Sequence, residues 1–249
     1  MQLLFGIGAL WGKSTTVGFT GGPDQFGILQ ENSVEFNFEV KELYSQLGFP
    51  VDIARGKGKI SGKAKMARVF GALYGDLFFG EPVVSGETTV AEDELTTLAS
   101  ATYTVGNAAA FLADLGVDYN SGGRGRFAFV TGAPSAGQYA TGANGVYTFN
   151  TGDIGQSLAI SYVYTVGSGT GKTISINNEF MGYTPTFATT FYQTRSTLGS
   201  SGQLTLRLNE CVSSRLTFPS RIDDYNIPDF DFMAFSSGSN QIGVLSTTE

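Results

Sequence analysis

Two segments in the first third of the chain alternate between apolar and polar residues at every position. In residues 33–41 the apolar positions are Val34, Phe36, Phe38 and Val40, and the polar positions are Ser33, Glu35, Asn37, Glu39 and Lys41. Successive side chains of a β-strand point to opposite faces, so a period of two indicates a strand and not a helix. We therefore predict a strand with one buried and one polar face.

The second alternating segment, residues 51–65, has a basic face and a face of mostly small residues. The polar positions are Arg55, Lys57, Lys59, Ser61, Lys63 and Lys65, and the others are Ala54, Gly56, Gly58, Ile60, Gly62 and Ala64. The small residues predict a strand that another backbone approaches closely. The basic row has three interpretations: pairing with an acidic row across the sheet, a solvated surface, or a nucleic-acid groove. The absence of interleaved aromatic residues disfavours the groove.

A single amphipathic helix is predicted next, over about residues 65–78. Met66, Val69, Phe70, Leu73 and Leu77 recur at helical spacing, and Gly80 is a suitable terminator. We expect this helix to flank a sheet.

Residues 86–170 differ from the sequence on either side. Short β-rich segments recur there at regular spacing and are separated by Gly-rich turns, a pattern typical of a small sandwich or barrel. We predict an inserted β module over 86–170, within a discontinuous domain of residues 1–85 and 171–249. A single continuous domain is the alternative. We interpret the acidic run Glu92-Asp93-Glu94 as charged surface.

The composition supports a mainly β protein and removes several kinds of catalytic site. The chain has 34 Gly, 13% aromatic residues and 15% charged residues, which suits a sheet protein with many tight turns. It has no His and one Cys, Cys211. Ser-His and Cys-His nucleophiles, disulfides and cysteine metal sites are therefore excluded within this sequence. The net charge of −7 predicts repulsion of nucleic acid by the molecule as a whole.

We expect neither a membrane-spanning run in this sequence nor a signal peptide in its apolar N-terminal stretch. No apolar run approaches the roughly 20 residues that span a membrane. The apolar stretch Leu3–Gly12 lacks a preceding basic residue and contains three Gly, which is unlike a signal peptide. We expect it to be an ordered strand or a docking arm.

Two motifs suggest enzymes, but both have simpler explanations. Gly171-Lys172-Thr173 resembles the end of a phosphate-binding loop, yet Val166 stands where the first Gly belongs and strand-like segments flank the motif. We predict a hairpin tip between strands at 158–166 and 174–177. Asp229 and Asp231 share one face of a strand, as a glycosidase pair or as exposed acidic residues. We predict no catalysis, no cofactor and no metal.

Specific stretches of the chain resemble the major tail tube proteins of siphophages, the long, non-contractile-tailed phages. In the first half these are "FGIGALWG" (Phe5–Gly12), "VEFNFEVKELYSQLGFPVDIARGKGKISGKAK" (Val34–Lys65) and "LFFG" (Leu77–Gly80). In the last part they are "NNEFMGYTPTF" (Asn177–Phe187), "LRLNECVSSRL" (Leu206–Leu216) and "DDYNIPDFDFMAFSSGSNQIGVLS" (Asp223–Ser246). The middle segment Gly132–Thr165 is similar to a Gram-negative phage version of the family.

The resemblance implies a tail-tube-type β-sandwich or barrel with one flanking helix. It implies six-membered rings that stack into a tube in the virion tail, after synthesis in the host cytoplasm. The partners would be other copies of the chain, the tape-measure protein, the tail terminator and distal tail proteins. Double-stranded DNA would pass through the lumen without specific binding, and no membrane or cofactor is implied.

Candidate site residues follow from combining this resemblance with the alternating strands. If strands 33–41 and 54–64 form the inner wall, Glu35, Asn37 and Glu39 would face the lumen. Candidate contacts between subunits or rings are Phe5, Trp11, Arg55, Lys57, Lys59 and Lys63.

The alternative function is a phage surface decoration or carbohydrate-binding module. Tyr139, Tyr147, Tyr162 and Tyr164 would then form a sugar platform. Their shared parity with neighbouring aromatic positions instead favours packing inside the 86–170 module.

Overall fold

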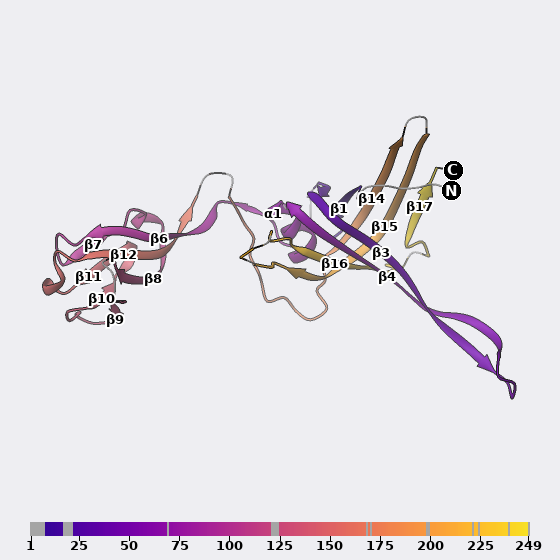
Figure 1. The fold of residues 1–249 in the computed structure, drawn as a ribbon, viewed down its shortest axis with the longest axis horizontal. Coiled ribbons are helices and arrows are strands. Elements are labelled where there is room, and N and C mark those ends of the chain that lie inside the picture. Colours follow the sequence, from indigo (N-terminus) through magenta and orange to yellow (C-terminus); the bar gives the residue numbers. More distant parts are fainter. Residues whose placement is uncertain are drawn as a thin grey trace. The chain divides into compact units, whose positions relative to one another are not determined.

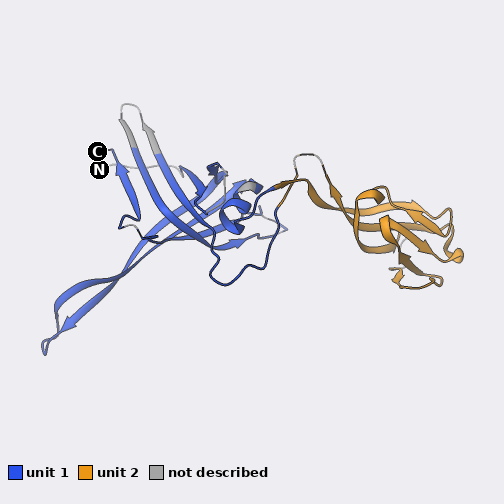
Figure 2. Ribbon diagram, turned by 180° about the vertical axis from the view of Figure 1, so that it is seen from behind, with its two compact units in different colours: residues 1–83, 174–249 blue, residues 84–173 orange. Residues whose placement is uncertain are grey.

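The computed structural model describes residues 8–16, 22–68, 70–120, 125–167, 169, 171–197, 200–220, 222–223, 225–238 and 240–248. The chain forms two compact units: unit 1 is Met1–Val83 with Ile174–Glu249, and unit 2 is Val84–Thr173 (Figure 2). Both units consist mainly of antiparallel β-sheet, which confirms the predicted mainly β class. Among the described helices, none is long and apolar enough to cross a membrane.

Unit 1 is built on one sheet of eight described strands in the order β2-β1-β14-β15-β16-β4-β3, with β17 also beside β15 (Figure 1). The strands are β1 (Ala9–Ser14), β2 (Asp24–Gln25), β3 (Ile28–Tyr44), β4 (Pro50–Arg68), β14 (Thr186–Thr197), β15 (Ser200–Thr217), β16 (Asp229–Ala234) and β17 (Gly243–Thr247). β1 lies between β2 and β14, so part of the predicted N-terminal strand or arm is a strand inside the sheet.

One face of this sheet carries the core of unit 1. Phe187, Phe230 and Phe232 are at most 1% exposed and pack together through tilted and edge-to-face ring contacts. The alternation in β16 confirms the predicted parity, because Phe230 and Phe232 are buried while Asp229 and Asp231 lie on the opposite, half-exposed face. Strands β1, β4 and β14 contribute Leu10, Met66 and Phe187 to the same core.

The predicted helix over 65–78 is wrong in its first third. β4 continues to Arg68, and the helical segment comprises α1 (Gly71–Leu73) and the π-helical turns of η1 (Tyr74–Phe79). Met66 satisfies the helical spacing, but it also alternates with Lys65, and in the structure it is a buried strand residue. Leu73 and Leu77 are fully buried against the sheet, and Gly80 ends the segment in the left-handed conformation, as predicted.

The small face of β4 is explained by aromatic rings rather than by another backbone. A Cβ atom on Gly62 would lie 2.1 Å from the ring of Phe232, its cross-strand partner on β16. On β3, the ring of Phe38 covers Gly58 in the same way. Glycine at 62 therefore lets the far end of the Phe232 ring approach the backbone of β4 in the core.

Unit 2 has two sheets that share one aromatic core, the arrangement of a small sandwich. The first sheet has the order β6 (Glu87–Thr97), β12 (Ser157–Val166), β8 (Phe111–Tyr119). The second has the order β7 (Thr102–Thr104), β11 (Val146–Phe149), β10 (Gln138–Thr141), β9 (Ala128–Phe129). The connections include the short 3₁₀ helices η2 (Ala108–Ala110), η3 (Ala143–Gly145) and η4 (Thr151–Asp153). The observed limits of unit 2, 84 and 173, lie close to the predicted limits, 86 and 170.

The predicted hairpin around Lys172 is wrong. β12 pairs with β6 and β8, whereas β13 (Lys172–Thr173) pairs with β5 (Val84–Ser85) at the other end of the inserted segment. The predicted strand beyond Thr173 is also wrong, because residues 174–180 have no regular secondary structure. The sequence pattern gave no information on this pairing, since its two strands are more than 80 residues apart.

One of the polar side chains buried in unit 1 carries a carboxyl group. Asp76 of η1 is 9% exposed. Its pKa is raised to about 7, chiefly by burial and further by its hydrogen bond with Asp24 of β2 and by the charge of that residue. Asp76 is therefore largely protonated in the folded protein below neutral pH.

Replacement of Gly62 by Ala should destabilise unit 1 by about 1–3 kcal/mol, because the added Cβ must displace the packed Phe232 ring. The free energy of unfolding can be followed in urea through Trp11, the single tryptophan, which lies on β1. Gly22→Ala is the control, since a Cβ there meets nothing within 4 Å, and it should leave stability unchanged or slightly raised. Equal effects of the two substitutions would contradict this packing.

The stability of unit 1 should fall as pH rises from about 4 to about 7. Folded Asp76 holds its proton through this window while the unfolded chain, with an ordinary pKa of 3.8, releases it. Asp76→Asn should flatten this dependence and make the protein more stable than wild type at pH 8, by an amount on the order of a few kcal/mol. Urea unfolding at pH 5 and pH 8 measures the difference, with the exposed Asp223→Asn as control. Parallel pH curves for wild type and Asp76→Asn would refute this assignment.

Candidate functional site

The most unusual feature of unit 1 is a hairpin formed where β3 and β4 extend past the rest of the sheet (Figure 1). β4 pairs with β16 only through residues 60–65, whereas its pairing with β3 continues to Tyr44 and Pro50. Among the described strands, residues 50–59 of β4 pair with β3 alone. We call residues 38–58 the projecting hairpin.

Large apolar side chains are exposed on both faces of the projecting hairpin. They are between 47% and 84% exposed and comprise Phe38, Val40, Leu43, Tyr44, Leu47, Phe49, Val51 and Ile53. A two-stranded ribbon has no further layer against which to bury them, and such ribbons are barely stable in water. An exposed apolar surface of this extent marks an interaction site.

The predicted buried face of residues 33–41 is therefore wrong beyond its first part. Val34 packs against the core, but Phe36, Phe38 and Val40 are 49%, 47% and 59% exposed. The register also shifts between Phe38 and Val40, where Glu39 of β3 lies opposite two residues of β4, Gly56 and Lys57, so the bulge is in β4. The pattern specifies a strand correctly but does not show whether anything covers its apolar face.

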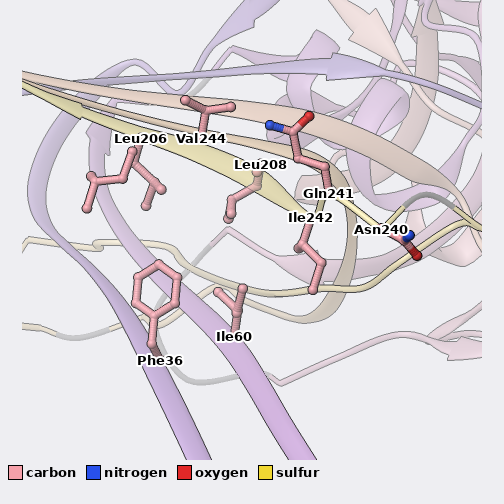
Figure 3. Close-up of a pocket in the computed structure, with 10 residues that line it drawn as sticks. Phe36, Ile60, Leu206, Leu208, Asn240, Gln241, Ile242 and Val244 are labelled. Carbon is pink, nitrogen blue, oxygen red and sulfur yellow. The ribbon is translucent and has the colours of Figure 1, made fainter.

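An apolar groove lies where the projecting hairpin joins the sheet (Figure 3). Its volume is about 510 Å³, and its apolar lining comes from four strands and the segment before β17: Phe36, Ile60, Leu206, Leu208, Ile242 and Val244. In the described part of the chain, β17 pairs only with β15. The edge of β17 away from β15 therefore has no partner strand among the described residues, and β17 lines one side of the groove.

The opposite face of the sheet carries charges whose sign alternates from strand to strand. β3 contributes Glu31 and Glu35, β4 contributes Lys59, Lys63 and Lys65, β16 contributes Asp229 and Asp231, and β15 contributes Arg215. We call these eight residues the charge ladder. It contains four acidic and four basic side chains, so its formal charge is zero.

Two ion pairs within the charge ladder link the basic strand to both of its neighbours. Lys65 donates a short hydrogen bond to Glu31, which lowers the pKa of Glu31 and raises that of Lys65. Lys63 Nζ lies 3.8 Å from Asp229 Oδ2. Glu35, Lys59, Lys63 and Asp231 also line one polar hollow of about 300 Å³. Of the three interpretations of the basic row, cross-strand pairing therefore holds for Lys63 and Lys65.

The other predicted site residues are dispersed. Asn37 Nδ2 lies 3.5 Å from Glu35 Oε2, so these two share a face, while Glu39 lies opposite the bulge in β4. The guanidinium of Arg55 lies over the Phe38 ring, 4.5 Å from its centroid.

Lys57 and Trp11 are not brought to a common site with the other candidates. Among the described residues, neither Lys57 nor Lys59 forms an ion pair. Trp11 is half-buried on β1, opposite Thr190 and Gln25. Phe5 lies outside the described residues.

The phosphate-loop motif does not have the geometry of a phosphate loop. Lys172 and Thr173 form the short strand β13, and no helix follows. Lys172 Nζ lies 3.2 Å from Ser85 Oγ, and Thr173 Oγ1 donates to the carbonyl of Gly86. A helix N-terminus, which such a loop needs, is missing at this position.

The tyrosines of unit 2 are core residues rather than a binding platform. Tyr139 and Tyr147 donate to Asp114 at 2.6 and 2.9 Å, and burial together with these bonds raises the pKa of both phenols. Tyr162 donates to Glu94 at 2.6 Å. All three tyrosines are at most 3% exposed, which confirms the packing interpretation and leaves no stacking surface for a sugar at these positions.

Glu94 is accordingly not simple charged surface, as the sequence had suggested. Its carboxylate also accepts bonds from Tyr103 Oη and from the backbone N–H of Gly106. No group of three or more Cys, Asp or Glu side chains in the described residues could hold a metal ion.

A scan against protein-family models and a search of curated proteins gave no match to the chain.

Proposed function

We propose that this protein is a structural subunit that assembles with copies of itself into stacked rings, forming the tail tube of a siphophage. The observation that carries the proposal is the projecting hairpin, with eight large apolar side chains exposed on an isolated ribbon. Burial of one such side chain contributes about 1.5–3 kcal/mol. Association of copies is the simplest process that removes this surface from water.

The apolar groove is the complementary surface on the same chain. The turn of the hairpin lies about ten residues of extended strand beyond Ile60, which is about 30 Å. The hairpin therefore cannot fold back into the groove at its own base. The groove of a second copy offers apolar contacts from Leu206, Leu208 and Val244 together with the unpaired edge of β17.

This pairing of different surfaces can build rings or tubes. The hairpin turn and the groove are separate parts of unit 1, so a contact in which one copy gives only its hairpin and the other only its groove is heterologous, or head-to-tail. A heterologous contact leaves one hairpin and one groove free at the ends until the ring closes or a filament grows. The six-membered stacked rings, the tape-measure partner and the passage of DNA are extensions of the proposal that rest on the sequence resemblance.

The unpaired edge of the unit 1 sheet also supports assembly. β3 is the last strand of the unit 1 sheet, and its outer edge runs through 17 residues without a partner in the described chain. Long exposed edges cause uncontrolled aggregation unless they are covered. Closure of edges between copies in a ring would cover them.

The double substitution Leu47→Ser with Phe49→Ser should block assembly without unfolding unit 1, because both side chains are already more than 75% exposed. Loss of two buried anchors should raise the critical concentration for assembly at least about tenfold. Light scattering and negative-stain microscopy measure assembly, alone and seeded with purified tails. The matched control is Leu95→Ser with Leu112→Ser, two exposed leucines of unit 2.

Wild type and control should form rings or tubes, and the hairpin variant should stay monomeric. The proposal fails if wild type remains monomeric even when seeded, or if the hairpin variant assembles as readily as the control.

A further inference from the structure

We infer that the acidic side chains of β3 and β16 neutralise the basic row of β4 in the charge ladder. This neutralisation prevents the lysines of β4 from binding the phosphates of double-stranded DNA. That this face meets DNA in the assembled tube rests on the proposed function. The masking of the lysines is a property of the folded chain and can be tested separately.

The basic row has the arrangement of a phosphate-binding surface. Lys59, Lys63 and Lys65 lie on one face of one strand, and Lys63 and Lys65 are about 7 Å apart along it. Arg215 adds a fourth cation two strands away. Each cation that contacts a phosphate releases a counterion, and this release supplies essentially all of the sequence-independent affinity for DNA. Unmasked, the row would hold the duplex.

Acidic side chains flank the row on both sides. Glu31 and Glu35 lie on β3, and Asp229 and Asp231 lie on β16. Adjacent strands are about 5 Å apart, which is well inside the screening length of about 10 Å at 0.1 M salt. A phosphate approaching this face therefore meets positive and negative charge together.

The ion pairs show that the masking is mutual. Glu31 has a lowered pKa and Lys65 a raised one, each chiefly because of the hydrogen bond between them, so both remain charged at neutral pH. These groups are exposed, and exposed ion pairs add little to stability. Cancellation of the surface charge is thus a better account of the ladder than a contribution to folding.

This inference revises the expectation that DNA is repelled by an acidic wall. The whole chain has a formal charge of −7, but the charge ladder has equal numbers of acidic and basic groups. The carboxylates that make the protein acidic therefore lie largely outside this face. A surface on which acidic and basic side chains alternate, with no net charge, neither binds nor strongly repels the DNA that passes it.

The test removes three of the four acidic side chains, keeping Glu31, and leaves the lysines. The ladder variant is Glu35→Gln with Asp229→Asn and Asp231→Asn, which changes the formal charge of the chain from −7 to −4. The matched control is Glu87→Gln with Glu92→Gln and Asp93→Asn, the same charge change on exposed residues of unit 2. A reversal variant adds Lys59→Ala and Lys63→Ala to the ladder variant.

Binding is measured by fluorescence anisotropy with two labelled 30-base-pair duplexes of unrelated sequence, at 50 and 200 mM NaCl. Circular dichroism and size exclusion first establish that all proteins are folded and in the same oligomeric state. The ladder variant should bind both duplexes equally, with an affinity that falls about 40-fold between the two salt concentrations if three phosphates are contacted. Wild type, control and reversal variant should not bind.

The inference is overturned if the ladder variant binds no better than wild type, if the control gains as much affinity, or if the reversal variant keeps it. Binding by wild type would also overturn it. Tube formation is scored on the same wild-type protein by microscopy. A ladder variant without DNA affinity beside normal wild-type tubes would refute the inference alone, whereas failure of wild type to assemble would refute the proposed function.

Discussion

A two-stranded antiparallel ribbon has two faces, and by itself it has no other sheet or helix to pack against either of them. β3 and β4 pair from Ile28 and Arg68 to Tyr44 and Pro50, but the sheet that supports them ends at Ile60. Up to that point several of their apolar residues, such as Val34 and Ala64, pack in one core with Phe230 and Phe232, whereas Phe49, Val51 and Ile53 beyond it are exposed. In the described part of the chain nothing covers these side chains, and the assembly proposal rests on that observation.

Strands β3 and β4 contribute to three surfaces. Which surface a residue joins depends on its position along the strand and on the face to which its side chain points. Inward residues near Ala64 build the core, outward residues near Lys63 build a neutral charged face, and the residues beyond Gly58 form the exposed apolar surface. Local geometry accounts for two of these surfaces. The ion pairs form because adjacent strands are close together, and the hairpin is exposed because no other described strand lies beside it. Unit 2 is independent of this arrangement, since its own core closes around Tyr147 and Tyr162.

The sequence predicted the features that depend on the period of the apolar residues, namely strands and their faces. It did not predict features that depend on contacts between residues far apart in the chain. Strands β3 and β4 and the opposite faces of Asp231 and Phe232 follow from alternation alone. The helix was placed too early because Met66 fits both a period of two and a helical spacing. The groove could not be predicted, because Phe36, Leu206 and Val244 come together only through the order of strands in the sheet. The sequence contained one sign of the hairpin. The alternating segment that begins near Ile53 is longer than the roughly 3–10 residues of a typical strand, so a sheet was not expected to cover all of it.

Cysteine cross-linking of the hairpin turn to the groove tests the central claim most directly. The one native cysteine, Cys211, is buried and its thiol pKa is raised to about 12 by burial, so it will not compete. In a chain carrying Leu47→Cys and Leu245→Cys, mild oxidation of the assembled protein should give a ladder of covalent oligomers on a denaturing gel, and each single variant should give none beyond dimers. A double variant that yields only monomers, with wild-type tubes present, would show that the hairpin does not enter the groove of a second copy.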